Sequence, residues 1–167
     1  DRVEDDQDIR RTQKQSGVED YKHLQLPGRR VQAFASEGHI ELPEEAQNFI
    51  TNEYLIVGSS ESHGHGVPAR YCGGGQFRTL RRDHLSIRGG RSLQALNLGQ
   101  HFLLDALYDP EITLITVYGK AGTGKTLLTV GAALEQVQNS EYEKMLITRV
   151  IMPTGKDIGY LPGRLEE

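Results

Sequence analysis

A glycine-rich stretch at residues 119–126 carries the clearest chemical signal in this sequence. It reads Gly-Lys-Ala-Gly-Thr-Gly-Lys-Thr and matches the pattern G-x-x-x-x-G-K-[ST] at every fixed position. Glycines let a backbone approach phosphate oxygens closely, and successive N–H groups in such a loop form a nest for an anion. The stretch predicts a phosphate-binding loop for a nucleoside triphosphate, with ATP and Mg²⁺ as the expected ligands. The expected phosphate contacts are Gly119, Lys120, Ala121, Gly122, Thr123, Gly124, Lys125 and Thr126.

Two side chains of this loop have distinct expected roles. Lys125 brings a mobile positive charge to the β- and γ-phosphates and is the candidate catalytic residue, and the Thr126 hydroxyl is a candidate Mg²⁺ ligand. A working NTPase also needs an acid at the end of a neighbouring strand. Asp105 imitates such an acid but falls in a predicted helix before the loop, and no apolar strand ending in Asp follows Lys125. We therefore expect a truncated ATPase domain that by itself hydrolyses neither ATP nor RNA.

A phosphate-binding loop needs a strand before it and a helix after it, and the sequence supplies both. Residues 113–118 form a short β-branched apolar run, typical of a strand buried in a parallel sheet. Residues 125–138 predict a helix, and residues 145–150 predict a second strand. Together they predict a βαβ unit with a right-handed crossover. Leucines at helical spacing predict a further helix over residues 92–107.

The preceding residues, 31–87, have the pattern of a β structure. Alternating or apolar runs predict strands at 31–35, 53–58, 68–72 and 76–80, separated by turn clusters. A small antiparallel sheet or barrel is the expected arrangement, and Gly89-Gly90 indicates a joint. The predicted organisation is a polar segment over residues 1–21, a β-rich linker module over 22–90, and the start of an α/β P-loop NTPase domain over 91–167.

Composition limits the class of protein. The chain has 167 residues, of which 37% are hydrophobic and 25% charged, as in soluble globular proteins. No apolar run approaches the ~20 residues that a membrane span needs. The acidic first residues cannot form a signal peptide. A lone cysteine, Cys72, rules out an internal disulfide and favours a cytoplasmic location.

The net charge of −4 hides a basic stretch. Six arginines lie between Arg70 and Arg91 against one acid, Asp83. This stretch could face RNA, with Arg81 and Arg82 as candidate contacts and Phe77 as the aromatic side chain placed to stack on a base. A solvated sheet face is the alternative. His63-Gly64-His65 resembles part of a metal clip, but no acid or cysteine is spaced to complete it.

Further motifs extend the pattern beyond the loop. They are Asn97-x-x-Gln100, Asp105, Asp109-Pro110-Glu111-Ile112, residues 119–128, and Thr148-Arg149-x-x-x-Pro153-x-Gly155-Lys156-Asp157-Ile158-Gly159-x-Leu161-Pro162-Gly163. Together they resemble the PhoH-like ATPases, most closely the branch with a PIN nuclease domain in front. The resemblance spans nearly all of residues 92–167. Upstream, residues 52–54 and 69–71 resemble that family's β linker, and parts of residues 3–21 resemble the tail of its PIN domain. Departures occur at Gly99, Val150 and Thr12-Gln13.

The resemblance implies ATP hydrolysis coupled to RNA unwinding, a metal-dependent ribonuclease in the PIN part, and homo-oligomeric rings. Gln100 would contact the adenine edge, with a solvated glutamine as the alternative. Arg149 and Lys156 would meet RNA phosphate or nucleotide, or have a structural role instead. Asp6 would be a metal-binding acid of the PIN part, or simply belong to an acidic terminus.

Two other functions remain open from the sequence. One is a P-loop kinase acting on a small substrate, although the loops of such kinases usually lie near the start of the chain. The other is a nucleotide-gated binding module that never hydrolyses its nucleotide.

Overall fold

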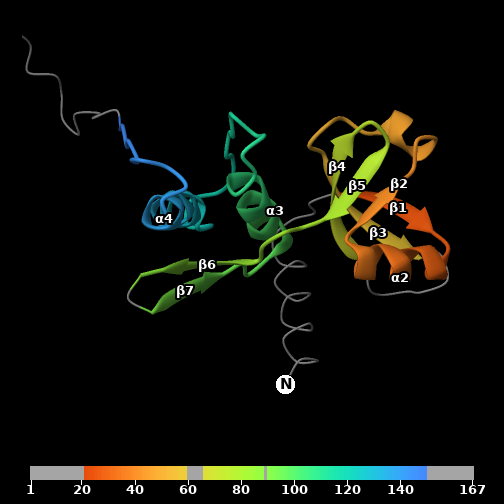
Figure 1. The fold of residues 1–167 in the computed structure, drawn as a ribbon, viewed down its shortest axis with the longest axis horizontal. Coiled ribbons are helices and arrows are strands. Elements are labelled where there is room, and N and C mark those ends of the chain that lie inside the picture. Colours follow the sequence, from red (N-terminus) through yellow and green to blue (C-terminus); the bar gives the residue numbers. More distant parts are fainter. Residues whose placement is uncertain (1–20, 60–65, 89, 150–167) are drawn as a thin grey trace, which may run out of the picture.

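The computed structural model describes residues 21–59, 66–88 and 90–149. Figure 1 shows two groups of elements. A mixed sheet with one helix lies on one side, and a helix pair with a β-hairpin lies on the other. Helix α3 (Leu98–Leu107) lies between the sheet and helix α4 (Lys125–Gln138).

The sheet of the first group has the strand order β1-β3-β4-β5-β2. Strand β1 pairs in parallel with β3, and the other pairs are antiparallel. The sheet is therefore mixed, whereas a purely antiparallel one was expected. Its elements, in chain order, are β1 (Lys22–Leu26), α2 (Gly28–Glu37), β2 (His39–Glu41), the 3-10 helix η1 (Glu45–Asn48), β3 (Tyr54–Ser59), β4 (Val67–Gly73) and β5 (Gln76–Thr79).

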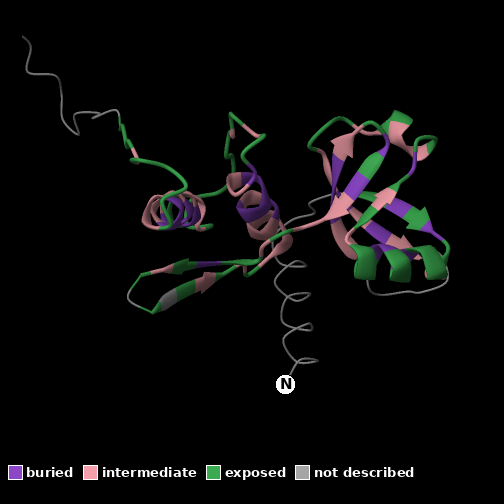
Figure 2. Cartoon of the chain, in the orientation of Figure 1, coloured by how far each residue is buried: buried purple, intermediate pink, exposed green. Residues whose placement is uncertain are grey.

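The core of this group lies between the sheet and α2. Phe34, Leu55 and Phe77 are almost completely buried in it, and Figure 2 shows buried residues along the strands. The predicted strands in 53–58, 68–72 and 76–80 are confirmed as β3, β4 and β5. The predicted strand at 31–35 is wrong, because these residues lie in α2. Val31 and Phe34 bury one helical face at i, i+3 spacing.

The second group consists of α3, α4 and the hairpin of β6 (His84–Ile87) and β7 (Arg91–Gln94). Its core contains Leu85, Leu104, Leu128 and Ala132. Gly131 lies against the hairpin so closely that a Cβ there would be 3.2 Å from a methyl carbon of Leu85. The hairpin therefore packs directly on the helix that follows the phosphate loop.

The hairpin changes two sequence-based interpretations. Helix α3 begins at Leu98, so the predicted helix over 92–107 is six residues too long, and residues 92–94 belong to β7. Asn97 ends the non-helical part by accepting a hydrogen bond from the backbone N–H of Gln100 (2.9 Å). Gly90, expected in a joint, lies in the turn of the hairpin with a left-handed φ of 79°, and Gly89 lies outside the described residues.

The predicted helix over residues 125–138 is confirmed, but the strands expected on either side of it are not. Residues 113–118 and 145–149 have no strand assignment, and Leu114 and Leu146 are 80% and 85% exposed. Within the described residues, no neighbouring strand offers these segments a hydrogen-bonding ladder. Apolar β-branched sequence alone does not form a strand without such a partner. Val150 lies outside the described residues.

A cluster of buried ion pairs joins the two groups. We call it the joint cluster, and it consists of Arg70 and Arg78 of the sheet, Asp105 and Asp109 of α3 and its C-terminal end, and Tyr54. Arg78 binds Asp105 Oδ1 at 3.1 Å and Asp109 Oδ2 at 3.0 Å. Arg70 pairs with Asp109, and Tyr54 donates a hydrogen bond to Asp105 Oδ2 (3.0 Å). Tyr54 also stacks on Phe102 of α3, with ring centroids 4.7 Å apart.

Removing one carboxylate of the joint cluster should destabilise the protein strongly. Asp105→Asn removes one of the two carboxylates that compensate the positive charge of the Arg78 guanidinium. The free energy of unfolding should therefore fall by about 3 to 5 kcal/mol. The matched control is Asp83→Asn, because Asp83 pairs with His84 at the surface. The control should change the free energy of unfolding by about 1 kcal/mol or less. Urea denaturation measures both values, and equal losses would show that the joint cluster contributes nothing special.

Candidate nucleotide-binding site

The glycine-rich loop lies immediately before α4, as the motif requires. Gly124 is the N-cap of this helix, and Lys125 is its first residue. Gly122 and Gly124 have φ values of 81° and 80°, in the left-handed region that residues with a Cβ rarely adopt. Residues 119–122 are exposed. The loop thus presents its backbone to solvent at the positive end of the helix dipole, which favours an anion.

The ammonium group of Lys125 lies inside the loop. Its Nζ donates hydrogen bonds to the carbonyl of Gly119 (2.8 Å), to the hydroxyl of Thr123 (3.2 Å) and to the carbonyl of Lys120. The Thr123 hydroxyl in turn donates to the Lys120 carbonyl (2.9 Å). The loop oxygens therefore hold the cation in the structure. A phosphate group would compete with these neutral oxygens for the ammonium and win by its charge.

Thr126 fits the expected role of a magnesium ligand by its position. It is exposed on the first turn of α4, next to Lys125. A hydroxyl there can reach a cation bound to phosphates held by the loop. In the described part of the chain, no group of three or more His, Cys, Asp or Glu side chains could hold a metal ion by itself. A Mg²⁺ ion bound beside Thr126 would take further ligands from the nucleotide's phosphate oxygens and from water.

Gln100 lies against the same loop. Its Nε2 donates a hydrogen bond to the carbonyl of Thr123 (3.2 Å), and its Oε1 accepts one from the backbone N–H of Leu96 (2.7 Å). The structure therefore places Gln100 against Thr123 and Gly124, the residues just before Lys125. The contact that Gln100 makes is with the loop backbone.

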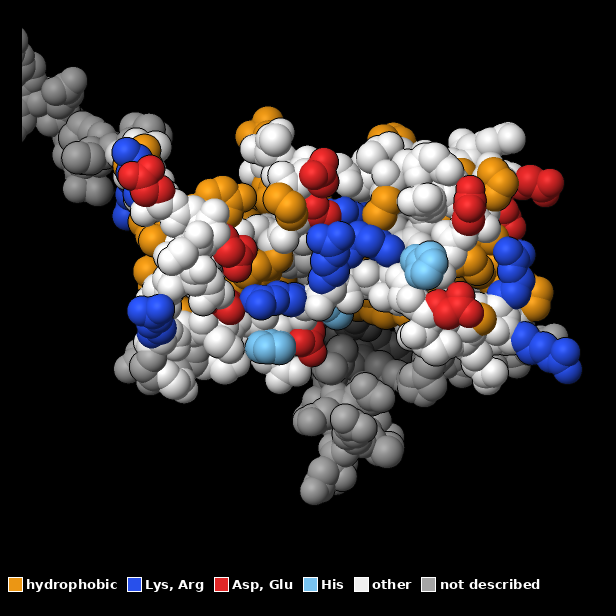
Figure 3. Space-filling model, in the orientation of Figure 1, with side chains coloured by type: hydrophobic (Ala, Val, Ile, Leu, Met, Phe, Trp, Pro, Cys, Tyr) orange, Lys and Arg blue, Asp and Glu red, His pale blue; other side chains and the backbone are white. Residues whose placement is uncertain are grey.

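Five of the six arginines have described side chains, and some of these pair with acids whereas others are exposed. Arg70 and Arg78 belong to the joint cluster. Arg82 binds Glu135 at 3.0 Å and lies 4.4 Å from the ring centroid of Tyr108. Arg81 and Arg88 are exposed. On the face drawn in Figure 3, Lys and Arg side chains gather near the middle, over the connection between β5 and β6.

The remaining predicted contacts have different outcomes. Phe77 is completely buried in the core of the sheet, so its expected role as a stacking platform is wrong. Arg149 is exposed, at the end of the described segment that follows α4. Asp6, Lys156 and His63-Gly64-His65 lie outside the described residues.

Glu135 is a buried acid with several hydrogen-bond donors around it, and the sequence did not predict it as a site residue. It lies on α4 and accepts hydrogen bonds from the backbone N–H of Ser86 (3.0 Å), from Arg82 (3.0 Å) and from the hydroxyl of Tyr108. Burial acts to raise the pKa of Glu135, but these hydrogen bonds and the charge of Arg82 outweigh it and hold the pKa below its usual value. Glu135 is spaced to lie on the same face of the predicted helix as Leu128 and Ala132. This spacing could have indicated that the acid is buried.

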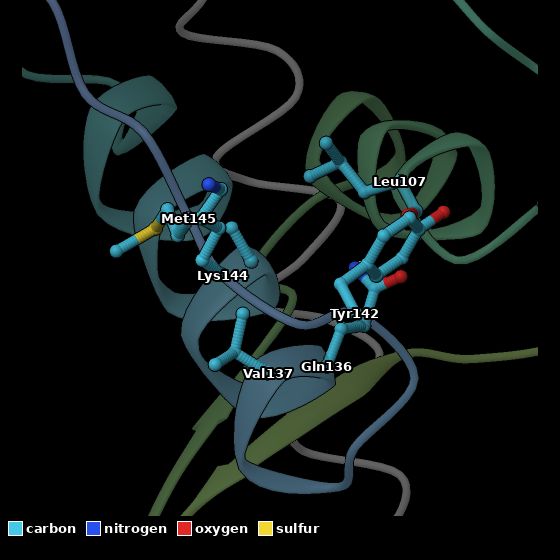
Figure 4. A pocket seen from close by; sticks show the side chains of 7 residues that line it. Leu107, Gln136, Val137, Tyr142, Lys144 and Met145 are labelled. Atoms are coloured by element: carbon cyan, nitrogen blue, oxygen red, sulfur yellow. The ribbon is translucent and has the colours of Figure 1, made fainter.

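A separate cavity lies at the other end of α4. It has a volume of about 220 Å³ and lies between α3, the last turns of α4 and the segment that follows. Figure 4 shows the side chains around it. The lining includes no acid, and the phosphate loop is at the opposite end of the helix, so this cavity is not part of the nucleotide site. Its lining residues are Leu107, Ala133, Gln136, Val137, Tyr142, Lys144 and Met145.

The loop, its lysine and the helix behind it define a P-loop protein. Residues 92–167 match the family model described as "PhoH-like protein". Among curated relatives, Protein PhoH2 of Bacillus subtilis (strain 168) is 34% identical over 154 residues, which cover 88% of this chain and 33% of the relative. Protein PhoH2 of Mycolicibacterium smegmatis is 30% identical over 156 residues, which cover 91% of this chain and 33% of the relative. Residues 92–167 of the chain therefore belong to a PhoH-like protein.

The chain spans about a third of the length of these relatives. No solved structure gives a significant match. Among the described residues, no helix is both long and apolar enough to cross a membrane. The expected PIN part falls on residues 1–21, of which 1–20 lie outside the described residues, so it stays a prediction.

Replacing Glu135 should reduce the pH dependence of stability in acid. Because its folded-state pKa is lowered, the carboxylate stabilises the fold above its unfolded pKa, near 4.5, and this contribution disappears as the pH falls through the folded value. Glu135→Gln should lower the free energy of unfolding by about 1 to 3 kcal/mol at pH 7. The difference from the unmodified protein should shrink below about pH 4.

The matched control is Glu141→Gln, an exposed acid just beyond the same helix. Urea titrations at a series of pH values give the comparison. Parallel curves for the unmodified protein and Glu135→Gln would contradict the assignment of this carboxylate to the acid-dependent part of stability.

Proposed function

We propose that this chain binds ATP together with Mg²⁺ at residues 119–126. The observation that carries the proposal is the ammonium of Lys125, held inside a glycine loop at the N-terminus of α4. Left-handed glycines, a helix N-terminus and a cation held within the loop together form a site for a polyanion rather than for a neutral ligand.

Different groups of the loop bind different parts of the Mg-triphosphate. A triphosphate draws Lys125 away from the Gly119 carbonyl and the Thr123 hydroxyl and pairs with its charge. The loop N–H groups and the dipole of α4 hold the remaining phosphate charge. Thr126 offers its hydroxyl to Mg²⁺, which neutralises charge on the β- and γ-phosphates when bound.

For the longer proteins to which this chain is similar, we infer ATP hydrolysis coupled to RNA, in a homo-oligomeric assembly. The support from this chain is its family and its exposed arginines, Arg81 and Arg88. Arg149, also exposed, is a third candidate contact to RNA or nucleotide. Arg82 has a 38% exposed side chain, and RNA would compete there with Glu135 and Tyr108 for its guanidinium.

A nucleotide-gated binding module is the second candidate function, and one observation favours it. Asp105 is completely buried and accepts hydrogen bonds from Tyr54, Arg78 and the backbone N–H of Arg81. It therefore cannot hold Mg²⁺ or activate water. Phosphate release that depends on Lys125, measured on the unmodified chain beside Lys125→Ala, would contradict the binding-module candidate.

Lys125→Ala should weaken binding of the triphosphate much more than binding of adenosine. Only the phosphates lose a charge partner, and a charge-assisted hydrogen bond is worth about 1.5 to 3 kcal/mol, so the Kd for Mg-ATP should rise at least about tenfold. The matched control is Lys144→Ala, which removes the same charge beyond the far end of α4. Calorimetric titration with both ligands measures the effect. An equal loss for ATP and adenosine would remove the loop from the binding site.

Loss of the exposed arginines should flatten the salt dependence of RNA binding. In the variant Arg81→Gln with Arg88→Gln, the slope of log K against log salt for a single-stranded RNA should fall by about 0.7 for each arginine that had neutralised a phosphate. The control variant is Arg29→Gln with Arg30→Gln, which removes two exposed arginines of α2. Fluorescence anisotropy across a salt series gives the slopes, and a slope equal to that of the control would assign these arginines to a solvated face.

A further inference from the structure

Gln100 makes a contact that its expected role does not explain. A glutamine that reads the adenine edge needs both ends of its amide free for the base. Here Oε1 accepts the N–H of Leu96 at 2.7 Å, and Nε2 donates to the carbonyl of Thr123 at 3.2 Å. The amide thus bridges the start of α3 and the phosphate loop, and both its ends have protein partners.

The contact fixes the orientation of one peptide group of the loop. The C=O and N–H of a trans peptide point in opposite directions, and the described chain has no cis peptide. Anchoring the Thr123 carbonyl on α3 therefore turns the N–H of Gly124 away from α3. In that orientation the N–H can join the other loop N–H groups around an anion.

The approach between the two elements is close. A Cβ built on Gly124 would lie 3.2 Å from Nε2 of Gln100. Gly124 also has a left-handed φ of 80°, so two constraints favour glycine at this position. The side chain of Gln100 and the backbone of Gly124 therefore fit one another.

Gln100 is itself held in place from two sides. Its backbone N–H is capped by the side chain of Asn97 (2.9 Å), at the first turn of α3. The far end of α3 is fixed to the sheet through Asp105 and Asp109. A glutamine on a helix held in this way can position a loop, because its own position does not follow the loop.

We propose that Gln100 is a positioning residue: it holds the phosphate loop so that the Gly124 N–H faces the phosphates of the bound nucleotide. Gln100 does not read the base. This inference rests on the proposed function of residues 119–126 as the nucleotide site. It assigns Gln100 a role that is the same for every ligand carrying a triphosphate, whatever its base.

The test compares ligands that share phosphates but differ in the base. Gln100→Met keeps the length of the side chain and removes both hydrogen bonds. The Kd values for Mg-ATP, Mg-GTP and magnesium tripolyphosphate should all rise by a similar factor of about 3 to 10. This is the effect expected for losing one hydrogen bond to the ligand, the one from the Gly124 N–H to a phosphate. The ratio of ATP to GTP affinity should stay unchanged. If Gln100 reads the base, that ratio changes and tripolyphosphate binding does not, which would overturn the inference.

A second measurement works without any ligand. In Gln100→Met, the backbone amides of residues 120–124 should show lower order parameters by NMR relaxation, because the loop loses its anchor on α3. Gln32→Met, on the exposed face of α2, is the matched control and should leave them unchanged. Unchanged order parameters in Gln100→Met would overturn the positioning role. Binding of none of the three ligands by the unmodified chain would instead refute the proposed function, even if the loop measurement supports the anchor.

Discussion

The burial of two arginines against two aspartates is the constraint on which the other contacts depend. Arg70 and Arg78 come from neighbouring strands, whereas Asp105 and Asp109 come from α3 and its end. Removing four charges from water is costly, and Nε of both arginines is buried without a hydrogen-bond partner. Such a cluster adds little net stability but permits few alternative arrangements. It fixes α3 relative to the sheet, and α3 fixes Gln100 and, through it, the phosphate loop.

Local signals predicted the glycine loop and the helix after it. The loop and the helix over residues 125–138 depend on glycines, a helix start and a short range of sequence, so the motif was sufficient. The three central strands of the sheet were also visible as apolar runs. The misassigned residues 31–35 contain two alanines and bury only Val31 and Phe34, whose i, i+3 spacing places them on one face of a helix but on opposite faces of a strand. Residues 113–118 show the opposite case, a strand-like sequence without a pairing partner.

The number of arginines in this stretch could not predict which of them pair with acids and which are exposed. Arg70 and Arg82 find their acids 39 and 53 residues further along the chain, on helices that only the fold brings near. A local count of charges compares a residue with its sequence neighbours and therefore registers an excess of positive charge. The fold pairs three of the six arginines with acids. The contact of Gln100 with Thr123 has the same origin, since it spans 23 residues.

The close packing of Gly131 on Leu85 has an evolutionary consequence. Gly131 has no side chain, and the two methyl groups of Leu85 fill the space opposite it. This contact sets the distance between α4 and the hairpin. A larger residue at position 131 fits only when position 85 becomes smaller, since protein interiors leave no spare volume. Among related chains, these two positions should therefore vary together, large against small, even though they lie far apart in the sequence.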